Sequence, residues 1–348
     1  MQRITLDGVA DYARELIAAC ASTADAFPVR QCVDLAGLSI DVFSDHGALA
    51  QAMAYGMATT APASGSPASI FLAHPAIGAM QPSARWGEEL FSQQAFSARL
   101  EANGLRGSYF HDLRYWQFYD VEKRSGVQLM LSADGCPPWE FGAPLRCFLH
   151  WEYAARGQRL THAGTLGIGG KGVLLAGGGG AGKSGTVVAG LLAGLDSVGD
   201  DYVLMDLSDG RATARPLFTT LKQDPAGFER LGLAARLPEP GELNWQGKYQ
   251  FRVQDIAPRG VANRLEIAAL LVPRISGGNK SIIEPLSRKD ALMALAPSGI
   301  AQMPGERESG FRFFGELTRQ LPCFRLSLGT RGDEIAETIA AFLESGRP

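Results

Sequence analysis

The segment GGGGAGKS at residues 177–184 constrains this chain more than any other feature, because it matches the phosphate-binding pattern G-x-x-x-x-G-K-[ST]. The apolar run GVLLA precedes it directly, and an apolar helical pattern follows it. Glycines let the backbone curl until successive N–H groups face phosphate oxygens, and the following helix adds partial positive charge at its N-terminus. A flexible linker is the alternative in a chain with 42 glycines, but the flanking strand and helix favour a phosphate loop.

Two side chains of this loop have predicted tasks. Lys183 would reach the β and γ phosphates of a nucleotide, and the hydroxyl of Ser184 would ligate Mg²⁺. The sequence has no Asn-Lys-x-Asp pattern that reads guanine, so ATP is the expected nucleotide and Mg²⁺ the expected metal. The predicted nucleotide-binding residues are Gly177, Gly178, Gly179, Gly180, Ala181, Gly182, Lys183, Ser184 and Gly185.

The first part of the chain mixes helical and strand patterns. At 348 residues the chain is long enough for two domains, and the prolines and glycine of CPPWEFGAP (136–144) place a boundary near residue 140. We therefore predict a smaller α+β N-terminal domain over residues 1–140. Within it, helices are predicted over 8–21 and 47–57, and strands over 38–43, 69–73, 115–121 and 126–132, the last two as a hairpin.

From residue 159 onward the pattern runs strand, turn, strand, loop, helix, strand, which is typical of a nucleotide-binding α/β layer. We therefore predict an α/β P-loop domain over residues 141–348. Its predicted elements are a helix over 145–155, strands over 159–168 and 172–176, a helix over 185–195, a strand that ends at Asp200, and a last helix over 333–344.

Composition excludes several classes of protein. The formal net charge is −3, with 33 basic and 36 acidic residues, which argues against nucleic acid or an anionic membrane as partner. The five cysteines form no CxxC pair, which argues against a disulfide framework or zinc site and suits a reducing cytoplasm. The N-terminus lacks a signal pattern, and no stretch reaches the roughly 18 apolar residues of a membrane span. We expect a cytoplasmic protein, with its oligomeric state open and a homo-oligomer included.

Asp200 and Asp201 follow the predicted P-loop helix, where a parallel layer would place them beside the loop. One carboxylate could hold Mg²⁺, and the other could orient an attacking hydroxyl or accept its proton. Because Gly-Asp-Asp also suits a solvated turn, the pair alone leaves both interpretations open. Asp206, which ends the apolar run VLMD (203–206), is a rival of Asp201 for the metal role.

The stretch from His162 through GVLLAGGGGAGKS to GDDYV resembles the C-terminal kinase domain of HPr kinase/phosphorylase and its HPr-kinase-related relatives, which include lasso-peptide precursor kinases. In that family a histidine precedes the loop and an Asp-Asp pair follows it. Here His162 lies 15 positions before Gly177, and Asp200 lies 17 positions after Lys183, and both intervals agree with the family pattern. The resemblance covers the region of about 160–206 well, the rest of the second domain loosely and residues 1–140 hardly at all.

This resemblance implies an HPr kinase-like catalytic domain with assigned roles. Asp200 would act on the substrate hydroxyl, Asp201 and Ser184 would serve the metal, and His162 would lie beside the acidic pair. The catalytic residues are then Asp200, His162 and Lys183.

The chain also departs from the family. Gly185 stands where the bifunctional HPr enzymes have a glutamate, and their downstream glycine-rich motif is missing. We therefore expect a one-way kinase whose acceptor is a serine of a peptide or protein, such as a peptide natural-product precursor. A small-molecule hydroxyl kinase and a nucleotide-switched binding protein are the alternatives.

Two further motifs have weaker interpretations. GKYQFRV (247–253) alternates like a strand, so Lys248 or Arg252 would stabilise charge on the transferred phosphoryl group unless that face is simply solvated. ISGGNK (275–280) is similar to a signature of ABC transporter ATPases, but its strand-like approach and polar end favour a hairpin turn.

The N-terminal domain is expected to help select the acceptor, because it shows none of the resemblance found in the catalytic half. Deleting residues 1–135 should then abolish phosphorylation of the peptide acceptor, provided that circular dichroism shows the remainder to be folded. Unchanged peptide phosphorylation by the folded remainder would refute this role.

Overall fold

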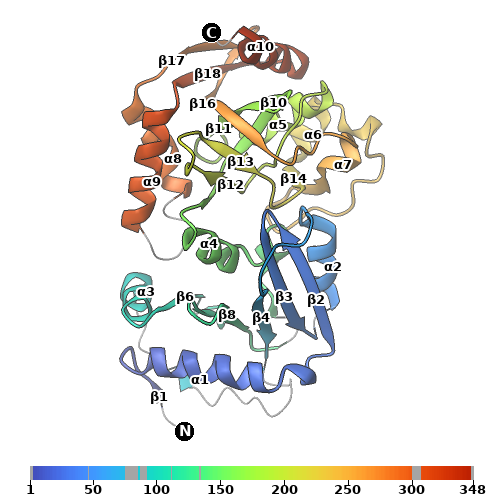
Figure 1. Ribbon diagram of the computed structural model, residues 1–348. Helices are drawn as coiled ribbons and strands as arrows, with labels where there is room; N and C mark the ends of the chain where they lie inside the picture. The colour runs from blue at the N-terminus through green and yellow to red at the C-terminus, as the bar shows by residue number, and fades with distance from the viewer. Residues whose placement is uncertain are drawn as a thin grey trace. The chain divides into compact units, whose positions relative to one another are not determined.

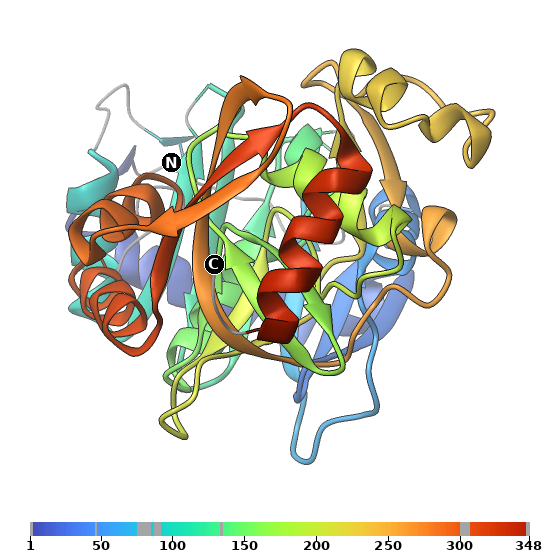
Figure 2. The ribbon, with the colours of Figure 1, turned by 90° about the horizontal axis from the view of Figure 1, so that it is seen from above.

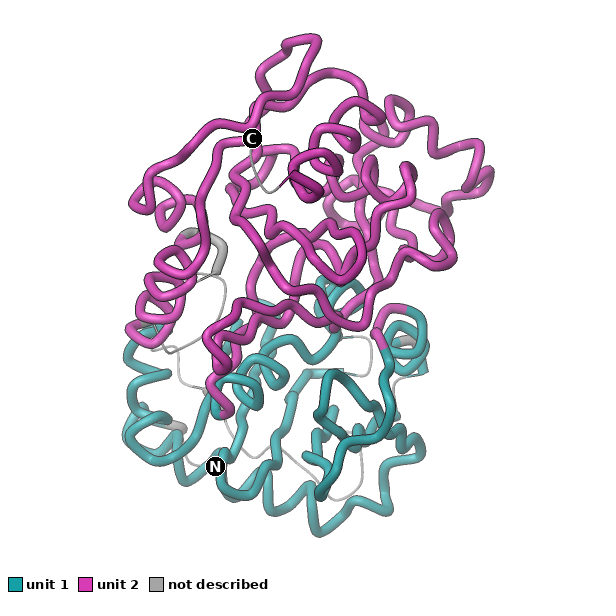
Figure 3. Tube along the Cα trace, turned by 45° about the horizontal axis from the view of Figure 1, so that its top comes forward, with its two compact units in different colours: residues 1–55, 59–155, 303–305 teal, residues 56–58, 156–302, 306–348 magenta. Residues whose placement is uncertain are grey.

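The computed structural model describes residues 3–45, 47–74, 85–86, 92–110, 112–132, 135–299 and 307–345. The chain is a mixed α/β protein that divides into two compact units, coloured separately in Figure 3. Unit 1 holds most of residues 1–155, and unit 2 holds most of residues 156–348. No helix in the described part of the chain combines the length and the apolar character that crossing a bilayer demands.

Unit 1 is built on a six-stranded sheet of order β2-β3-β4-β8-β7-β6 (Figure 1). β3 is buried along its whole length and pairs antiparallel with β2 and parallel with β4. β7 and β8 form the predicted antiparallel hairpin. The strands are β2 (Val29–Leu35), β3 (Leu38–Ser44), β4 (Ala68–Ala73), β6 (Leu105–Phe110), β7 (Tyr115–Asp120) and β8 (Ser125–Leu129).

Helix α1 packs against β4, β7 and β8 because its apolar side chains recur at helical spacing and form one buried stripe. α3 contacts both α1 and β6, and the two helices share an aromatic core with the sheet. The remaining elements of this unit are β1 (Arg3–Ile4), α1 (Val9–Ser22), η1 (Ala24–Ala26), α2 (Gly47–Gly56), β5 (Arg85–Trp86), α3 (Gln93–Glu101) and η3 (Pro138–Phe141).

Helix α4 (Arg146–Ala154) belongs to unit 1, so the boundary falls after Ala155 and not near residue 140. The reason is packing: the ring of Trp151 stacks on Tyr119 with centroids 6.1 Å apart, and the hydroxyl of Tyr153 donates to the carbonyl of Leu35 at 2.5 Å. Glu152 accepts hydrogen bonds from both Tyr119 and Arg124. The prolines of 136–144 therefore break regular structure without ending the unit.

Unit 2 is built on an eight-stranded mixed sheet, in which β10-β11-β16-β13-β12-β9 form one path and β18 joins β16 to β17. β11, β16 and β18 are mutually parallel, and the other pairs are antiparallel. Its strands are β9 (Arg159–Thr161), β10 (Gly164–Ile168), β11 (Lys171–Leu175), β12 (Val203–Asp206), β13 (Thr213–Arg215), β16 (Leu265–Gly278), β17 (Ile282–Pro285) and β18 (Cys323–Gly329).

Helices cover both faces of this sheet, as Figure 2 shows for β16 and β18. α5 (Lys183–Leu192) and α10 (Gly332–Ser345) share one apolar core with it, and α8 (Arg288–Gly299) and α9 (Arg307–Gln320) share the other. A two-stranded ladder lies against α5. It consists of β14 (Thr220–Gln223) and β15 (Tyr249–Arg252), and the short helices nearby are α6 (Pro225–Arg230), η4 (Leu233–Ala235) and α7 (Val253–Ile256).

Three local predictions differ from the structure. The stretch 159–168 is two strands, because β9 ends at Thr161 and pairs with β12, whereas β10 begins at Gly164 and pairs with β11. Asp200 and Asp201 do not end a strand but lie in a bend just before β12. The segment 275–280 is not a hairpin turn, since β18 lies between β16 and β17 and pairs with both.

Gly190 in the middle of α5 has a packing reason that can be tested. A Cβ there would lie 2.4 Å from Cδ2 of Leu166, whose side chain is fully buried. Gly190→Ala should therefore lower the free energy of unfolding by about 1–3 kcal/mol through overpacking, although alanine is the better helix former. Urea unfolding measures this change.

Gly315 in α9 is the matched control, because a Cβ there would meet nothing within 4 Å. Gly315→Ala should raise the free energy of unfolding by roughly 0.5–1 kcal/mol. Equal effects of the two substitutions would contradict this packing account.

Candidate active site

The phosphate loop connects β11 to α5, in the strand-loop-helix setting that the motif requires. Gly180 and Gly182 adopt positive φ angles of 77° and 99°. A Cβ on Gly182 would lie 2.4 Å from Cδ1 of Leu328, so only glycine fits there. Both the amide and the hydroxyl of Thr186 donate to the carbonyl of Gly182, which fixes the first turn of α5. The loop is thus held between α5 and the ends of the parallel strands.

Lys183 lies almost buried within this loop, with 7% of its surface exposed. Its ammonium donates to the carbonyls of Gly177 at 2.6 Å and Gly178 at 3.2 Å. Burial lowers the pKa of Lys183, while the nearby Asp200 and Asp201 act in the opposite direction. The ammonium is therefore poorly solvated and close to the acidic pair.

The acidic pair is placed by a bend with an unusual backbone. Gly199 and Asp201 have positive φ angles of 143° and 75°, and aspartate is among the few residues that tolerate such a conformation. The buried hydroxyls of Thr165 and Ser197, 3.0 Å apart, hold this bend: each donates to the carbonyl of Gly199, and each accepts an amide from residues 198–199. The bend is therefore fixed by β10 rather than left to solvent, which excludes the solvated-turn interpretation.

Asp200 points into the protein toward the loop. Its exposed fraction is 2%, and the hydroxyl of Ser184 is near enough to lower its pKa. Its Oδ1 makes no hydrogen bond within the described residues. Burial raises the pKa of Asp200, and the charge of Asp201 raises it further, while Ser184 and Lys183 lower it. This carboxylate is therefore desolvated.

Asp201 has a different environment, with about a third of its side chain (32%) exposed. Its Oδ1 lies 2.9 Å from Nε2 of His162, and its Oδ2 accepts a hydrogen bond from Nζ of Lys222 at 2.8 Å. Burial alone would raise the pKa of Asp201, but the hydrogen bonds and charges of His162 and Lys222 outweigh it and lower the pKa below its usual range. Asp201 is thus held as an ion by two partners.

The position of His162 follows from strand register. β9 and β12 are antiparallel with Thr161 opposite Val203, so the next residue, His162, comes alongside Tyr202 and Asp201. The rings of His162 and Tyr202 lie 5.4 Å apart. The histidine that the sequence singled out therefore does lie beside the acidic pair.

A solved structure is similar in part to this chain. It is the structure of the Hpr(Ser) kinase/phosphatase from Coxiella burnetii, which matches over 37% of this chain and 72% of its own with 16% sequence identity and a TM-score of 0.25. No family model matches the chain, and no curated protein matches it either.

Ser184, which was predicted to hold the metal together with Asp201, is near enough to Asp200 to lower its pKa. Asp206 lies at the far end of β12, where it bonds Gln158 and Ser208 and does not face the loop. In the described part of the chain, no cluster of three or more His, Cys, Asp or Glu side chains forms a ready-made metal site.

The two cations predicted to stabilise the phosphoryl group lie in different environments. Arg252 is held by Asp255 through Nη2 to Oδ1 at 2.7 Å and Nε to Oδ1 at 3.1 Å, so its guanidinium is engaged there. Lys248 is close enough to lower the pKa of Lys183. Lys222, which contacts Asp201 directly, has no sequence signal, because its position depends on how the β14–β15 ladder lies against α5.

The two aspartates should affect stability in opposite directions. Asp201→Asn removes a carboxylate that is stabilised in the folded state, so the free energy of unfolding at pH 7 should fall. Because Asp201 is partly exposed, the loss should be only about 1 kcal/mol. Asp200→Asn removes a desolvated charge, so the free energy of unfolding at pH 7 should rise. Urea unfolding of both variants at pH 7 and at pH 4 measures these changes.

The pH dependence follows from the directions of the pKa shifts. The folded-state pKa of Asp201 lies below its unfolded value of about 4, so its contribution is present above pH 4 and is lost at lower pH. The folded-state pKa of Asp200 lies above its unfolded value, so its penalty appears only as pH rises above about 4. If both substitutions changed the free energy of unfolding in the same direction at pH 7, the environments described for Asp200 and Asp201 would be wrong.

Proposed function

We propose that this chain is an ATP-dependent kinase that transfers the γ-phosphoryl group of Mg·ATP to a hydroxyl, that of a serine in a peptide or protein. One observation carries the proposal: a phosphate loop, its serine and two carboxylates of unlike environment meet in unit 2. Phosphoryl transfer needs alignment and charge neutralisation more than covalent help, and this set of groups supplies both.

The loop and Lys183 would bind the terminal phosphates. Backbone N–H groups at the start of α5 face anions, and the helix dipole adds to them. The ammonium of Lys183 would exchange the carbonyls of Gly177 and Gly178 for phosphate oxygens. Because this ammonium is nearly buried, its attraction for phosphate is less screened than that of a surface lysine.

The residues present fit a magnesium ion. Mg²⁺ commonly binds one or two carboxylates together with substrate phosphates and water, so a three-carboxylate cluster is not needed. Ser184 and Asp200 would hold it, since the Ser184 hydroxyl is near enough to lower the pKa of Asp200 and Oδ1 of Asp200 has no hydrogen bond within the described residues. When bound, the ion would supply positive charge that neutralises the charge on the phosphates. This pairing replaces Asp201 by Asp200 in the metal role predicted from sequence.

Asp201 would then orient the acceptor hydroxyl and accept its proton. It is the more exposed of the two carboxylates, and its partners His162 and Lys222 keep it ionised and in place. A low pKa suits orientation better than early proton removal, which a loose phosphoryl transition state does not require. Lys222 and Lys248 would add positive charge near the transferred group, the role predicted from sequence for Lys248 or Arg252.

Three substitutions separate these roles. Lys183→Ala should weaken Mg·ATP binding by tenfold or more and abolish transfer. Asp200→Asn should remove most of the dependence of ATP binding on Mg²⁺. Asp201→Asn should bind Mg·ATP like the wild type but lose at least about a hundredfold in transfer, in line with the loss of one acid–base group.

Calorimetry with and without Mg²⁺ measures binding, and label transfer from γ-labelled ATP to a serine-containing peptide library measures transfer. Asp209→Asn is the control, because Asp209 is exposed and should change neither. Full transfer by Asp201→Asn would refute its assigned role. ATP turnover without any labelled product would favour the nucleotide-switched binding protein, and label on a metabolite would favour the small-molecule kinase.

A further inference from the structure

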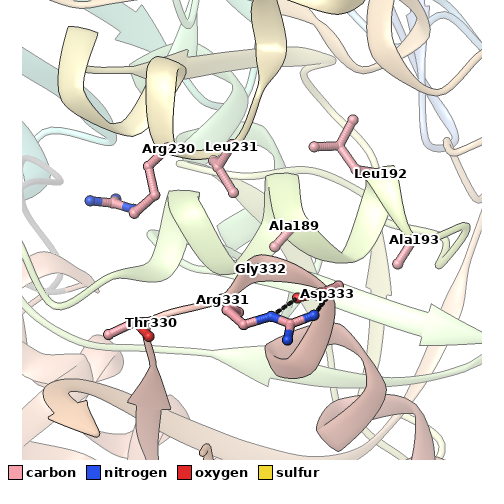
Figure 4. A pocket seen from close by; sticks show the side chains of 9 residues that line it. All are labelled: Ala189, Leu192, Ala193, Arg230, Leu231, Thr330, Arg331, Gly332 and Asp333. Atoms are coloured by element: carbon pink, nitrogen blue, oxygen red, sulfur yellow. Dashed lines mark hydrogen bonds and ion pairs between the residues drawn. The ribbon is translucent and has the colours of Figure 1, made fainter. Parts of the chain in front are cut away.

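A cavity of about 410 Å³ lies beside the C-terminal half of α5 in unit 2 (Figure 4). Ala189 and Leu192 of α5 contribute apolar surface on one side, and Leu231 contributes it on another. Arg230, Thr330 and Arg331 add polar groups. This volume falls within the range of small-molecule pockets, and the mixture of apolar walls and few polar groups is typical of them.

Two elements connect this cavity to the phosphate loop. Along α5, Ala189 lies six positions after Lys183, which is roughly 9 Å at 1.5 Å per residue. Along β18, the side chain of Leu328 lies against Gly182, and Thr330 follows two residues later, roughly 7 Å further along the chain. A ribose and base attached to phosphates in the loop span a distance of this kind.

The walls suit a flat, partly apolar ring. Gly332 contributes no side chain, and a Cβ there would lie 3.1 Å from Leu231 and 3.3 Å from Ala189, so glycine keeps this wall thin. The guanidinium of Arg331 is engaged edge-on by both carboxylate oxygens of Asp333. An edge-on pairing of this kind orients the guanidinium plane and leaves its face for stacking on an aromatic ring.

We propose that this cavity is the nucleoside subsite, which takes the base and ribose of a purine nucleoside triphosphate whose phosphates lie in the loop. The proposal rests on the proposed function, because it assumes that the loop binds phosphates. Arg331 stacks on the base, and the apolar side chains of α5 and Leu231 cover the rest of the ring. The subsite makes the chain prefer a nucleotide over a bare chain of phosphates.

Calorimetry on the full chain with Mg·ATP and with Mg·tripolyphosphate tests this. The wild type should bind ATP at least about tenfold more tightly than tripolyphosphate. Arg331→Ala should weaken ATP binding about fivefold to tenfold, as expected for loss of a cation–π contact, and leave tripolyphosphate binding unchanged. Ala193→Trp, which fills the cavity from an exposed position at the end of α5, should act in the same way without disturbing the core.

Arg211→Ala is the matched control, because Arg211 is also exposed and paired with an acidic side chain, Glu266, but does not line the cavity. It should change neither affinity. The subsite is overturned if both cavity variants bind ATP like the wild type, if they weaken both ligands equally, or if the wild type binds tripolyphosphate as tightly as ATP. A wild type that binds neither ligand would instead refute the proposed function.

Discussion

The bend at Gly199–Asp201 is the constraint on which the site depends, because it sends two neighbouring carboxylates to different partners. Asp200 turns inward to Ser184, and Asp201 turns to His162 and Lys222. The hydroxyls of Thr165 and Ser197 fix the bend from β10 and from the segment before it. If the bend relaxed to an ordinary backbone, the positive φ at Asp201 would be lost and the two carboxylates would no longer be separated in this way.

The site combines one charged side chain that its partners stabilise, Asp201, with two that are poorly solvated, Asp200 and Lys183. Asp201 gains stability from its partners, whereas the burial of Asp200 and Lys183 disfavours their charged forms. A folded protein retains such groups when the rest of the structure holds them, and perturbed pairs of this kind are typical of functional sites. A cation beside Asp200 and phosphate beside Lys183 would offset the cost of burying these two charges. Ligand binding would therefore be stronger than at solvated groups.

Much of this arrangement can be predicted from the sequence, and the limits have physical causes. The strand-loop-helix around GGGGAGKS and the proximity of His162 to the acidic pair are predictable, because both depend on local pattern and spacing. Which carboxylate meets Ser184 is not predictable, since it depends on the φ angle of one residue. Lys222 comes to the site only through the packing of the β14–β15 ladder, and α4 joins unit 1 through tertiary contacts of its aromatic side chains. Neither the position of Lys222 nor the membership of α4 in unit 1 produces a periodic pattern in the sequence.

The most direct test is a crystal structure of the full chain with Mn²⁺ and a non-hydrolysable ATP analogue, in which anomalous scattering locates the cation. The account predicts the β and γ phosphates within the loop of residues 177–184 and the cation in contact with Ser184 and Asp200. Phosphates bound outside this loop, or a cation held by Asp201 with Asp200 turned away, would contradict it.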